Sequence, residues 1–310
     1  MSKLVVILGP TSSGKTSLAL ELCHRHNGEI ISADSRQVYR LMNIGTNKGL
    51  VELIKDGFSS HWSLKGIPVW GINLVNPDHD FSVGEYLAYS IPKIKEIWKR
   101  EKIPFLVGGT GFYIDAVLGN TSIARVPSQP EFRSRCESLS NQELLNNLRT
   151  ISHDWAAKID PLNKRRLIRA LEVETYKDKY YQGDLPLLEA QETLLIGLSS
   201  LRETLYERAD RWADSIWQTG LLEESKELNK AGYKNTRPVR GIIYSIVFDY
   251  LDGKLTNQPA LERIKFDLHS YIRRQLTWFK KTPKVIWLDS GQDDYCNKAE
   301  LLVRAFINKE

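Results

Sequence analysis

The order of apolar and polar positions near the amino terminus predicts the start of a parallel α/β sheet. Residues 4–8 form a continuous apolar run that stops at Gly9, which is typical of a strand buried on both faces. Apolar and small side chains then recur at helical spacing over residues 16–26, and residues 29–33 indicate a second strand. This order of strand, loop, helix and strand is the opening of a βαβ unit.

Further apolar runs extend the predicted sheet. Residues 105–107 and residues 193–198 are short and apolar, and residues 285–288 give a final strand. A helical pattern over residues 83–101 precedes the first of them. Pro92 lies inside that pattern and is expected to kink the helix or split it in two.

The middle of the chain predicts a separate helical insertion. From about residue 120 to residue 184 the chain is polar and strongly charged, with leucines at helical spacing, whereas residues 261–279 form a long amphipathic pattern. We therefore expect an α/β fold: a core domain, with a parallel sheet flanked by helices, over residues 1–119 and 190–310. A helical insertion domain over residues 120–189 interrupts it.

The turn after the first strand has the sequence of a phosphate-binding loop. It matches G-x-x-x-x-G-K-[ST], with a strand before it and a helix after it. Such a loop turns backbone N–H groups and a helix N-terminus toward an anion, while its Lys adds charge and its Thr hydroxyl is a ligand for Mg²⁺. The residues predicted to bind phosphate are Gly9, Pro10, Thr11, Ser12, Ser13, Gly14, Lys15 and Thr16. With the motif in this place, the core domain is expected to be P-loop NTPase-like. The motif does not say which phosphate compound is bound.

Asp34 follows the second strand and is a candidate general base. The carboxyl ends of the strands in an open α/β sheet line one crevice, which places Asp34 near the phosphate loop and a second substrate. A carboxylate there can accept a proton from an attacking nucleophile. On this residue alone, an Asp that caps a helix or shapes a turn is the favoured interpretation.

Motifs along most of the chain reverse that preference, because together they resemble those of tRNA dimethylallyltransferases (isopentenyltransferases). They occur in family order and span about residues 4–290. The stretch around Asp34 is specific, whereas the phosphate loop alone is not. The segments are residues 9–16, 31–39, 44–46, 81–83, 107–111, 165–173, 220–224 and 273–279.

The resemblance implies transfer of a dimethylallyl group from dimethylallyl diphosphate to N6 of adenine 37, next to the tRNA anticodon. The product is N6-isopentenyladenosine. The phosphate loop, otherwise a signature of ATP-binding proteins, would hold the prenyl diphosphate. Lys15 and Mg²⁺ on Thr16 would stabilise charge on the leaving diphosphate, and Asp34 would take the proton of the adenine amine. The implied catalytic residues are Asp34, Lys15 and Thr16.

The resemblance also implies contacts with the tRNA anticodon stem-loop, from which the target adenine must be turned out. Thr110 matches a family position that contacts the target nucleotide. Two basic clusters, near residues 164–169 and 273–281, coincide with family tRNA-contact segments, although charge runs are usually solvated helix faces. The implied tRNA-binding residues are Asp34, Ser35, Arg36, Gln37, Thr110, Arg133, Arg165, Arg166, Arg169, Arg273, Arg274, Gln275 and Trp278.

Several positions depart from the family pattern. Trp212 stands where an Arg that helps to hold the diphosphate is usual, so Arg208 or Arg211 is expected to substitute for it. Residues 243–245 lack the usual glycine and charge, and Asn43 replaces a more usual Asp. These departures bear on efficiency, donor choice or tRNA choice and leave the motif residues intact.

Composition sets the remaining bounds. The 43 Lys and Arg against 38 Asp and Glu give a formal net charge of +5, which permits a polyanionic partner without requiring one. The three cysteines form no C-x-x-C pair, so a disulfide framework is not expected and a reducing cytoplasm fits. No long apolar segment predicts a signal peptide or membrane span. We expect a cytoplasmic monomer with no membrane partner.

Two other classes of function stay open on the residues alone. In a small-molecule kinase the same loop would hold ATP, and Asp34 would activate a hydroxyl. A non-catalytic RNA-binding factor would use the loop as a switch. Prenylation of RNA without ATP separates the transferase from the kinase. The variant Asp34→Ala distinguishes the transferase from the binding factor. In a transferase, this change should abolish prenylation and leave RNA affinity nearly unchanged.

Overall fold

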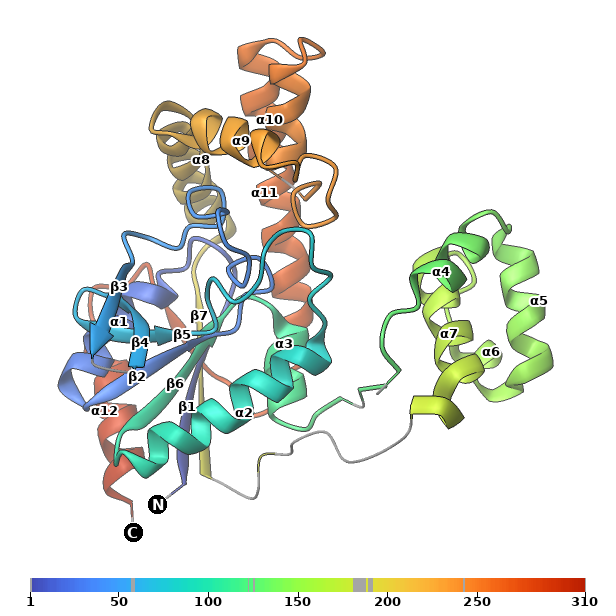
Figure 1. Ribbon diagram of the computed structural model, residues 1–310. Helices are drawn as coiled ribbons and strands as arrows, with labels where there is room; N and C mark the ends of the chain where they lie inside the picture. The colour runs from blue at the N-terminus through green and yellow to red at the C-terminus, as the bar shows by residue number, and fades with distance from the viewer. Residues whose placement is uncertain are drawn as a thin grey trace. The chain divides into compact units, whose positions relative to one another are not determined.

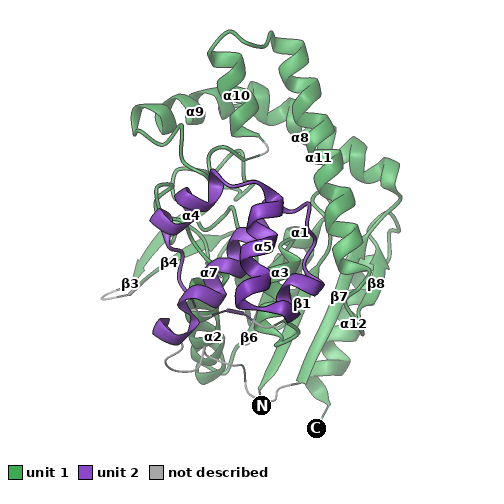
Figure 2. Cartoon of the chain, turned by 90° about the vertical axis from the view of Figure 1, so that its right-hand side faces the viewer, with its two compact units in different colours: residues 1–121, 188–310 green, residues 122–187 purple. Residues whose placement is uncertain are grey.

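The computed structural model describes residues 2–56, 59–121, 123–124, 126–180, 188, 192–241 and 243–309. The chain divides into two compact units (Figure 2). Unit 1 comprises Met1–Thr121 and Leu188–Glu310, and unit 2 comprises Ser122–Leu187. These boundaries lie within two residues of the predicted insertion, 120–189. The predicted end of the insertion's charged segment, at residue 184, lies outside the described residues.

Unit 1 is built on an eight-stranded sheet of order β3-β4-β5-β2-β6-β1-β7-β8. Neighbouring strands from β5 across to β8 are parallel, and β3 and β4 add an antiparallel edge. Because β6 lies between β1 and β2, the turn after β6 separates the phosphate loop from Asp34. The strands are β1 (Lys3–Leu8), β2 (Gly28–Ser32), β3 (Glu52–Asp56), β4 (Ser59–Leu64), β5 (Ile67–Trp70), β6 (Ile103–Gly108), β7 (Glu192–Ser199) and β8 (Ile286–Asp289).

Helices cover both faces of this sheet, which is why its central strands β1, β2 and β6 are almost entirely buried. Val5 and Ile7 of β1 share a hydrophobic cluster with α1 and α12, and the equally buried Leu4 and Val6 face the other side. Helices α2 and α3 pack on that other side (Figure 1). The helices of these two layers are α1 (Lys15–Arg25), α2 (Val83–Lys99), α3 (Gly111–Val117) and α12 (Tyr295–Asn308).

A further group of helices stands above the carboxyl ends of the strands (Figure 1). Its side chains form one hydrophobic cluster with Val38, Tyr39 and Met42, which follow β2. The segment after β2 is therefore fixed between the sheet and these helices. They are α8 (Arg202–Gln218), α9 (Leu221–Lys230), α10 (Tyr244–Leu251) and α11 (Asn257–Phe279).

Pro92 was predicted to kink the helix over residues 83–101 or to split it in two; the split is wrong, because α2 is one helix. Its N-terminus is closed by a capping box in which Ser82 and Glu85 bond each other's backbone N–H groups. The apolar face, including Ile91 and Ile94 on either side of the proline, is buried. Packing and capping thus offset the hydrogen bond that Pro92 cannot make.

Unit 2 has a hydrophobic core of its own, formed by the leucines that the sequence places at helical spacing. Leu144 and Leu148 pack with Leu167 and Leu171. Its helices are α4 (Pro130–Glu137), α5 (Asn141–Ile151), α6 (His153–Lys158) and α7 (Lys164–Tyr180). No described helix of either unit combines the length and the apolar character that crossing a membrane requires.

Candidate active site at the carboxyl edge of the sheet

A cavity of about 650 Å³ lies where the phosphate loop, the segment after β2 and helices α8, α10 and α11 meet. The three regions come from distant parts of the sequence, and the sheet order brings them together. Of the residues predicted from the sequence, the cavity wall includes Thr11, Ser12, Gly14, Lys15, Thr16, Asp34, Ser35, Arg36, Gln37, Arg208 and Arg274. The predicted catalytic set is therefore gathered in one place.

The phosphate loop owes its shape to its glycines. Gly9 has a φ of 148°, and a Cβ at this position would lie 2.2 Å from the carbonyl oxygen of Leu198 at the end of β7. Gly14 is left-handed and forms the N-cap of α1. Ser13 is fully buried within the loop, and its Oγ has no hydrogen-bond partner among the described residues. A buried polar atom left in this way fits a loop that binds an anion.

Lys15 begins α1, and its environment disfavours its positive charge in the absence of an anion. Its Nζ donates a hydrogen bond of 2.5 Å to the carbonyl oxygen of Pro10. Burial lowers the pKa of Lys15 to about 8, and the nearby charge of Asp34 raises it in part. A phosphate group in the cavity would stabilise the ammonium.

Asp34 shapes a turn and also lines the cavity. Its Oδ1 accepts hydrogen bonds from the backbone N–H groups of Arg36, at 2.8 Å, and Gln37, at 3.4 Å. These bonds shape the turn after β2. The same carboxyl group lines the cavity and acts electrostatically on Lys15. A turn residue and a group able to accept a proton are thus one side chain.

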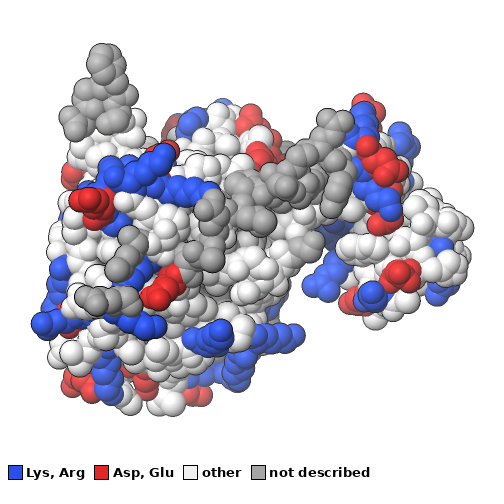
Figure 3. Space-filling view, turned by 90° about the horizontal axis from the view of Figure 1, so that it is seen from below, with Lys and Arg blue, Asp and Glu red and all other residues white. Residues whose placement is uncertain are grey.

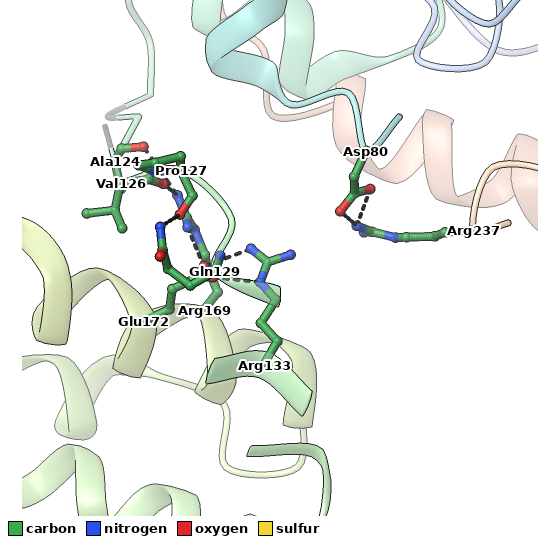
Figure 4. A network of polar contacts seen from close by, with 9 residues as sticks. All are labelled: Asp80, Ala124, Val126, Pro127, Gln129, Arg133, Arg169, Glu172 and Arg237. Carbon is green, nitrogen blue, oxygen red and sulfur yellow. Dashed lines mark hydrogen bonds and ion pairs between the residues drawn. The ribbon is translucent and has the colours of Figure 1, made fainter. Parts of the chain in front are cut away.

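Hydrogen bonds between loops hold this turn in place. Thr110, after β6, accepts a bond at its Oγ1 from the N–H of Ser35, at 3.0 Å, so this hydroxyl supports the turn that carries Asp34. Arg36 donates to the carbonyl oxygen of Pro238, at 3.0 Å. The preceding residue, Arg237, pairs with both carboxylate oxygens of Asp80 (Figure 4).

Of the two expected substitutes for the missing arginine, Arg208 lines the cavity and Arg211 is exposed outside its wall. Arg208 and Trp212 are four residues apart on α8, and both line the cavity. The Arg208 guanidinium donates to Oγ and to the carbonyl oxygen of Ser290, each at 3.0 Å. Arg208 is therefore the expected substitute that lines the cavity, and Trp212 adds apolar surface to the same wall.

The residues predicted on α11 separate into different environments. Gln275 is buried, and both ends of its amide are bonded to backbone: its Oε1 accepts from the N–H of Thr11, at 2.8 Å, and its Nε2 donates to the carbonyl oxygen of Gly109, at 3.0 Å. It braces the phosphate loop instead of facing RNA. Arg274 lines the cavity. Arg273 and Trp278 are exposed, and Trp278 donates to a carboxylate oxygen of Asp115, at 2.7 Å.

The predicted arginines of unit 2 also lie in different environments, two bonded within the protein and two exposed. Glu172 is fully buried and accepts hydrogen bonds from Arg133, Arg169 and the N–H of Gln129 (Figure 4). Arg169 also donates to the carbonyl oxygen of Val126, at 2.7 Å. These two arginines therefore hold the segment before α4 against α7. Arg165 and Arg166 are exposed on α7 and keep their side chains available to a partner.

Several residues that line or support the cavity were not predicted from the sequence. Tyr244 and Tyr271 line it, and Glu224 and Lys48 fix one of its walls from behind. Glu224 lies in the quoted segment 220–224, and Tyr244 in the segment that departs from the family. A buried lysine has no pattern of its own in a sequence.

The chain matches known proteins over most of its length. Residues 37–282 match the family model described as IPP transferase, and residues 2–56 match the model described as isopentenyl transferase. The tRNA dimethylallyltransferase of Halalkalibacterium halodurans is 36% identical over 306 residues, covering 96% of this chain and 94% of the relative. That of Thermoanaerobacter sp. (strain X514) is 37% identical over 310 residues, covering 96% and 95%.

Solved structures agree with the sequence comparisons. The full-length tRNA isopentenylpyrophosphate transferase of Bacillus halodurans has a TM-score of 0.69 and 36% identity, covering 99% of this chain and 96% of that chain. A eukaryotic dimethylallyltransferase acting on tRNA has a TM-score of 0.78 and 26% identity, covering 98% of this chain and 79% of that chain. With a family model and relatives matched over most of its length, the chain belongs to the IPP transferase family.

Proposed function

We propose that this protein transfers a dimethylallyl group from dimethylallyl diphosphate to N6 of adenine 37, next to the tRNA anticodon. The observation that carries the proposal is one cavity that joins a phosphate loop to the carboxylate of Asp34. Its relatives are tRNA dimethylallyltransferases, and one similar solved structure is of an enzyme acting on tRNA.

The diphosphate half of the donor fits the basic end of the cavity. Lys15 and Arg208 offer positive charge, and the phosphate loop offers backbone N–H groups. These groups favour the leaving diphosphate more than the intact ester, because negative charge grows on it as the allylic C–O bond breaks. Apolar side chains of the same wall suit the prenyl group: Met42, Trp212, Ile243, Tyr244 and Leu268.

We propose that Mg²⁺ assists the diphosphate. Thr16 lines the cavity next to Lys15, and a hydroxyl together with diphosphate oxygens is the kind of oxygen ligand set that Mg²⁺ prefers. When bound, the ion would neutralise part of the charge on the leaving group. Thr16 would hold it.

We propose that Asp34 receives the proton of the adenine amine. The amine attacks the allylic carbon, the C–O bond to the diphosphate breaks, and the proton moves to the Asp34 carboxylate. The adenine must leave the loop stack to reach this carboxylate. We propose that Arg36, Gln37 and Arg274, in the wall, contact the nucleotide, and that exposed Arg165, Arg166 and Arg273 contact phosphates.

Positive and negative side chains are mixed on the face of the molecule that Figure 3 shows. In the view of Figure 3, Lys and Arg side chains stand in separate groups with Asp and Glu among them. We propose that binding of tRNA depends on the particular arginines named above. We propose that the protein acts in the cytoplasm as a monomer.

The matched variant Asp34→Asn tests the role of the base. Asn keeps an oxygen that can accept the N–H groups of Arg36 and Gln37, so the turn is preserved, but it cannot take up the proton. We expect kcat to fall by about 10²–10⁴-fold while the affinity for an anticodon stem-loop RNA is unchanged.

The assay incubates the protein with dimethylallyl diphosphate, Mg²⁺ and stem-loop RNA without ATP, and analyses the nucleosides by mass spectrometry. Appearance of N6-isopentenyladenosine supports the proposal. ATP-dependent phosphate transfer with unmodified RNA would contradict it, and full activity of Asp34→Asn would remove Asp34 as the base.

A further inference from the structure

A carboxylate that the proposed reaction does not use fixes the cavity wall at residues 43–47. Glu224, on α9, accepts hydrogen bonds from three consecutive backbone N–H groups. The donors are Asn43 at 2.7 Å, Ile44 at 2.8 Å and Gly45 at 3.1 Å. Successive N–H groups that converge on one anion form a nest. Here the anion is the protein's own side chain, so this turn has a permanent internal ligand.

Tyr244 completes the arrangement around Glu224. Its hydroxyl donates to the same carboxylate, at 2.7 Å. Its ring fills the space beside Gly45, where an added Cβ would lie 2.6 Å from a ring carbon. Only a glycine allows this approach. Glu224 and the Tyr244 ring thus determine where Gly45 stands in the wall.

Lys48 holds the same turn through a second set of bonds. Its side chain is buried, with 4% exposure, and its Nζ donates to the carbonyl oxygen of Tyr39, to Oδ1 of Asn43 at 3.2 Å and to Oδ1 of Asn73 at 2.6 Å. An ammonium has three N–H groups, which match these three acceptors. All three acceptors are neutral. The charges that act on Lys48 are those of Glu224 and Asp34.

Lys48 can satisfy all three acceptors only while its side-chain amine is protonated. Burial lowers the pKa of Lys48 to about 7, and Glu224 and Asp34 raise it only in part. A neutral amine has two N–H groups and a lone pair, so one of the three buried acceptors would face the lone pair. The turn is therefore held best below pH 7, while Lys48 is charged.

We propose that Lys48 and Glu224 are positioning residues for the transfer reaction. Together they fix Gly45, Thr46 and Asn47, which line the cavity that also holds Lys15 and Asp34. Neither Lys48 nor Glu224 is in the cavity wall, so they act through the backbone that they hold. The inference rests on the proposed function and adds two residues to it.

The first test compares Lys48→Met and Asn43→Asp with the wild type across pH 6–9. We expect kcat/KM of the wild type to fall as the pH rises through about 7. Asn43→Asp puts a negative charge beside Nζ, which raises the pKa of Lys48 by about 1 unit or more and moves the fall upward. Lys48→Met should lose about 10²-fold at pH 7, as expected when a reacting group is misplaced by about 1 Å.

The second test needs no catalysis. Amide hydrogen exchange of the full chain, corrected for the intrinsic effect of pH, should show residues 43–48 losing protection between pH 6 and 8. Asn43→Asp should retain that protection. If both the activity profile and the exchange are the same in Asn43→Asp as in the wild type, or if Lys48→Met matches the wild type in both, the inference is overturned. A wild type that transfers nothing defeats the proposed function, and the exchange experiment still decides the role of Lys48.

Discussion

Lys15 shows how burial of one residue makes ligand binding depend on pH. Its pKa is lowered to about 8 by burial, against a partial opposing effect of Asp34. The charged form is the one that binds an anion. We therefore expect the affinity for an unreactive dimethylallyl diphosphate analogue to fall as pH rises above 8, by up to about tenfold per pH unit. Calorimetric titrations between pH 6.5 and 9.5 measure it.

Two variants control this prediction. Lys15→Met should bind the analogue weakly and without the dependence above pH 8. Asp34→Asn removes the charge that raises the pKa of Lys15, so the loss of affinity should begin at lower pH. An affinity that stays constant from pH 7 to 9.5 in the wild type would show that Lys15 does not carry the binding.

At Gln275 the type of residue alone did not predict its binding partner. The resemblance located its segment and implied a contact with tRNA, and the structure shows an amide that joins Thr11 to Gly109 inside the protein. A glutamine has the same donor and acceptor for either partner. Only the packing of α11 against the phosphate loop decides which partner it meets, and that packing has no signature in the local sequence.

At the scale of elements, strands buried on both faces were predictable, and the antiparallel strands β3 and β4 were not. The apolar runs at β1, β6 and β7 are strong because helices cover them on both sides. Strand β3 is at the sheet edge, where Leu53 is 46% exposed, so its sequence has no clear alternation. Helix α12 was missed, although Ala299, Leu302, Val303 and Phe306 recur at helical spacing and pack on the sheet.

The link between α4 and α7 in unit 2 depends on the charge of Glu172. Burial raises the pKa of this carboxyl, but hydrogen bonds from Arg133, Gln129 and Arg169 outweigh it and the pKa is lowered. Its stabilising effect is therefore present above the ordinary range of a Glu and is lost as pH falls through the lowered pKa. We expect Glu172→Gln to destabilise unit 2 by about 3 kcal/mol, because both arginines lose their counter-charge.

Hydrogen exchange of α4–α7 in the full chain measures this loss. Glu137→Gln is the matched control, since Glu137 is exposed on α4, and it should change the stability by less than about 0.5 kcal/mol. Equal effects of the two substitutions, or wild-type protection that persists in acid below the range of a Glu, would contradict the role of Glu172.

At the scale of the whole molecule, the order of elements predicted more than any single residue. A strand, phosphate loop and helix followed by a strand ending at Asp34 was enough to place Lys15 and Asp34 on one edge, and they share a cavity. The partners of buried groups were not predictable. Lys48 finds acceptors in Tyr39 and Asn73, and its contact with Asn73 joins positions 25 residues apart.

Unit 1 is expected to fold and to bind the diphosphate without unit 2, because each unit has its own hydrophobic core. Two hydrophobic clusters draw all their residues from unit 1, and another draws all of its residues from unit 2. The cavity wall contains residues of unit 1. Replacing residues 122–187 with a flexible Gly/Ser linker of about 12 residues, which reaches about 20 Å, should therefore leave unit 1 folded. Binding of the diphosphate analogue should be nearly unchanged, which calorimetry measures.

Binding of tRNA should respond differently, because the shortened chain lacks Arg165 and Arg166, two of the exposed arginines proposed to contact phosphates. Each lost phosphate contact lowers the magnitude of the slope of log affinity against log salt by about 0.7–0.9. We expect weaker binding of stem-loop RNA and a slope reduced by about two such steps. Arg165→Gln with Arg166→Gln in the full chain should reproduce that change in slope. An unchanged slope in both would mean that unit 2 does not contact the RNA backbone through α7.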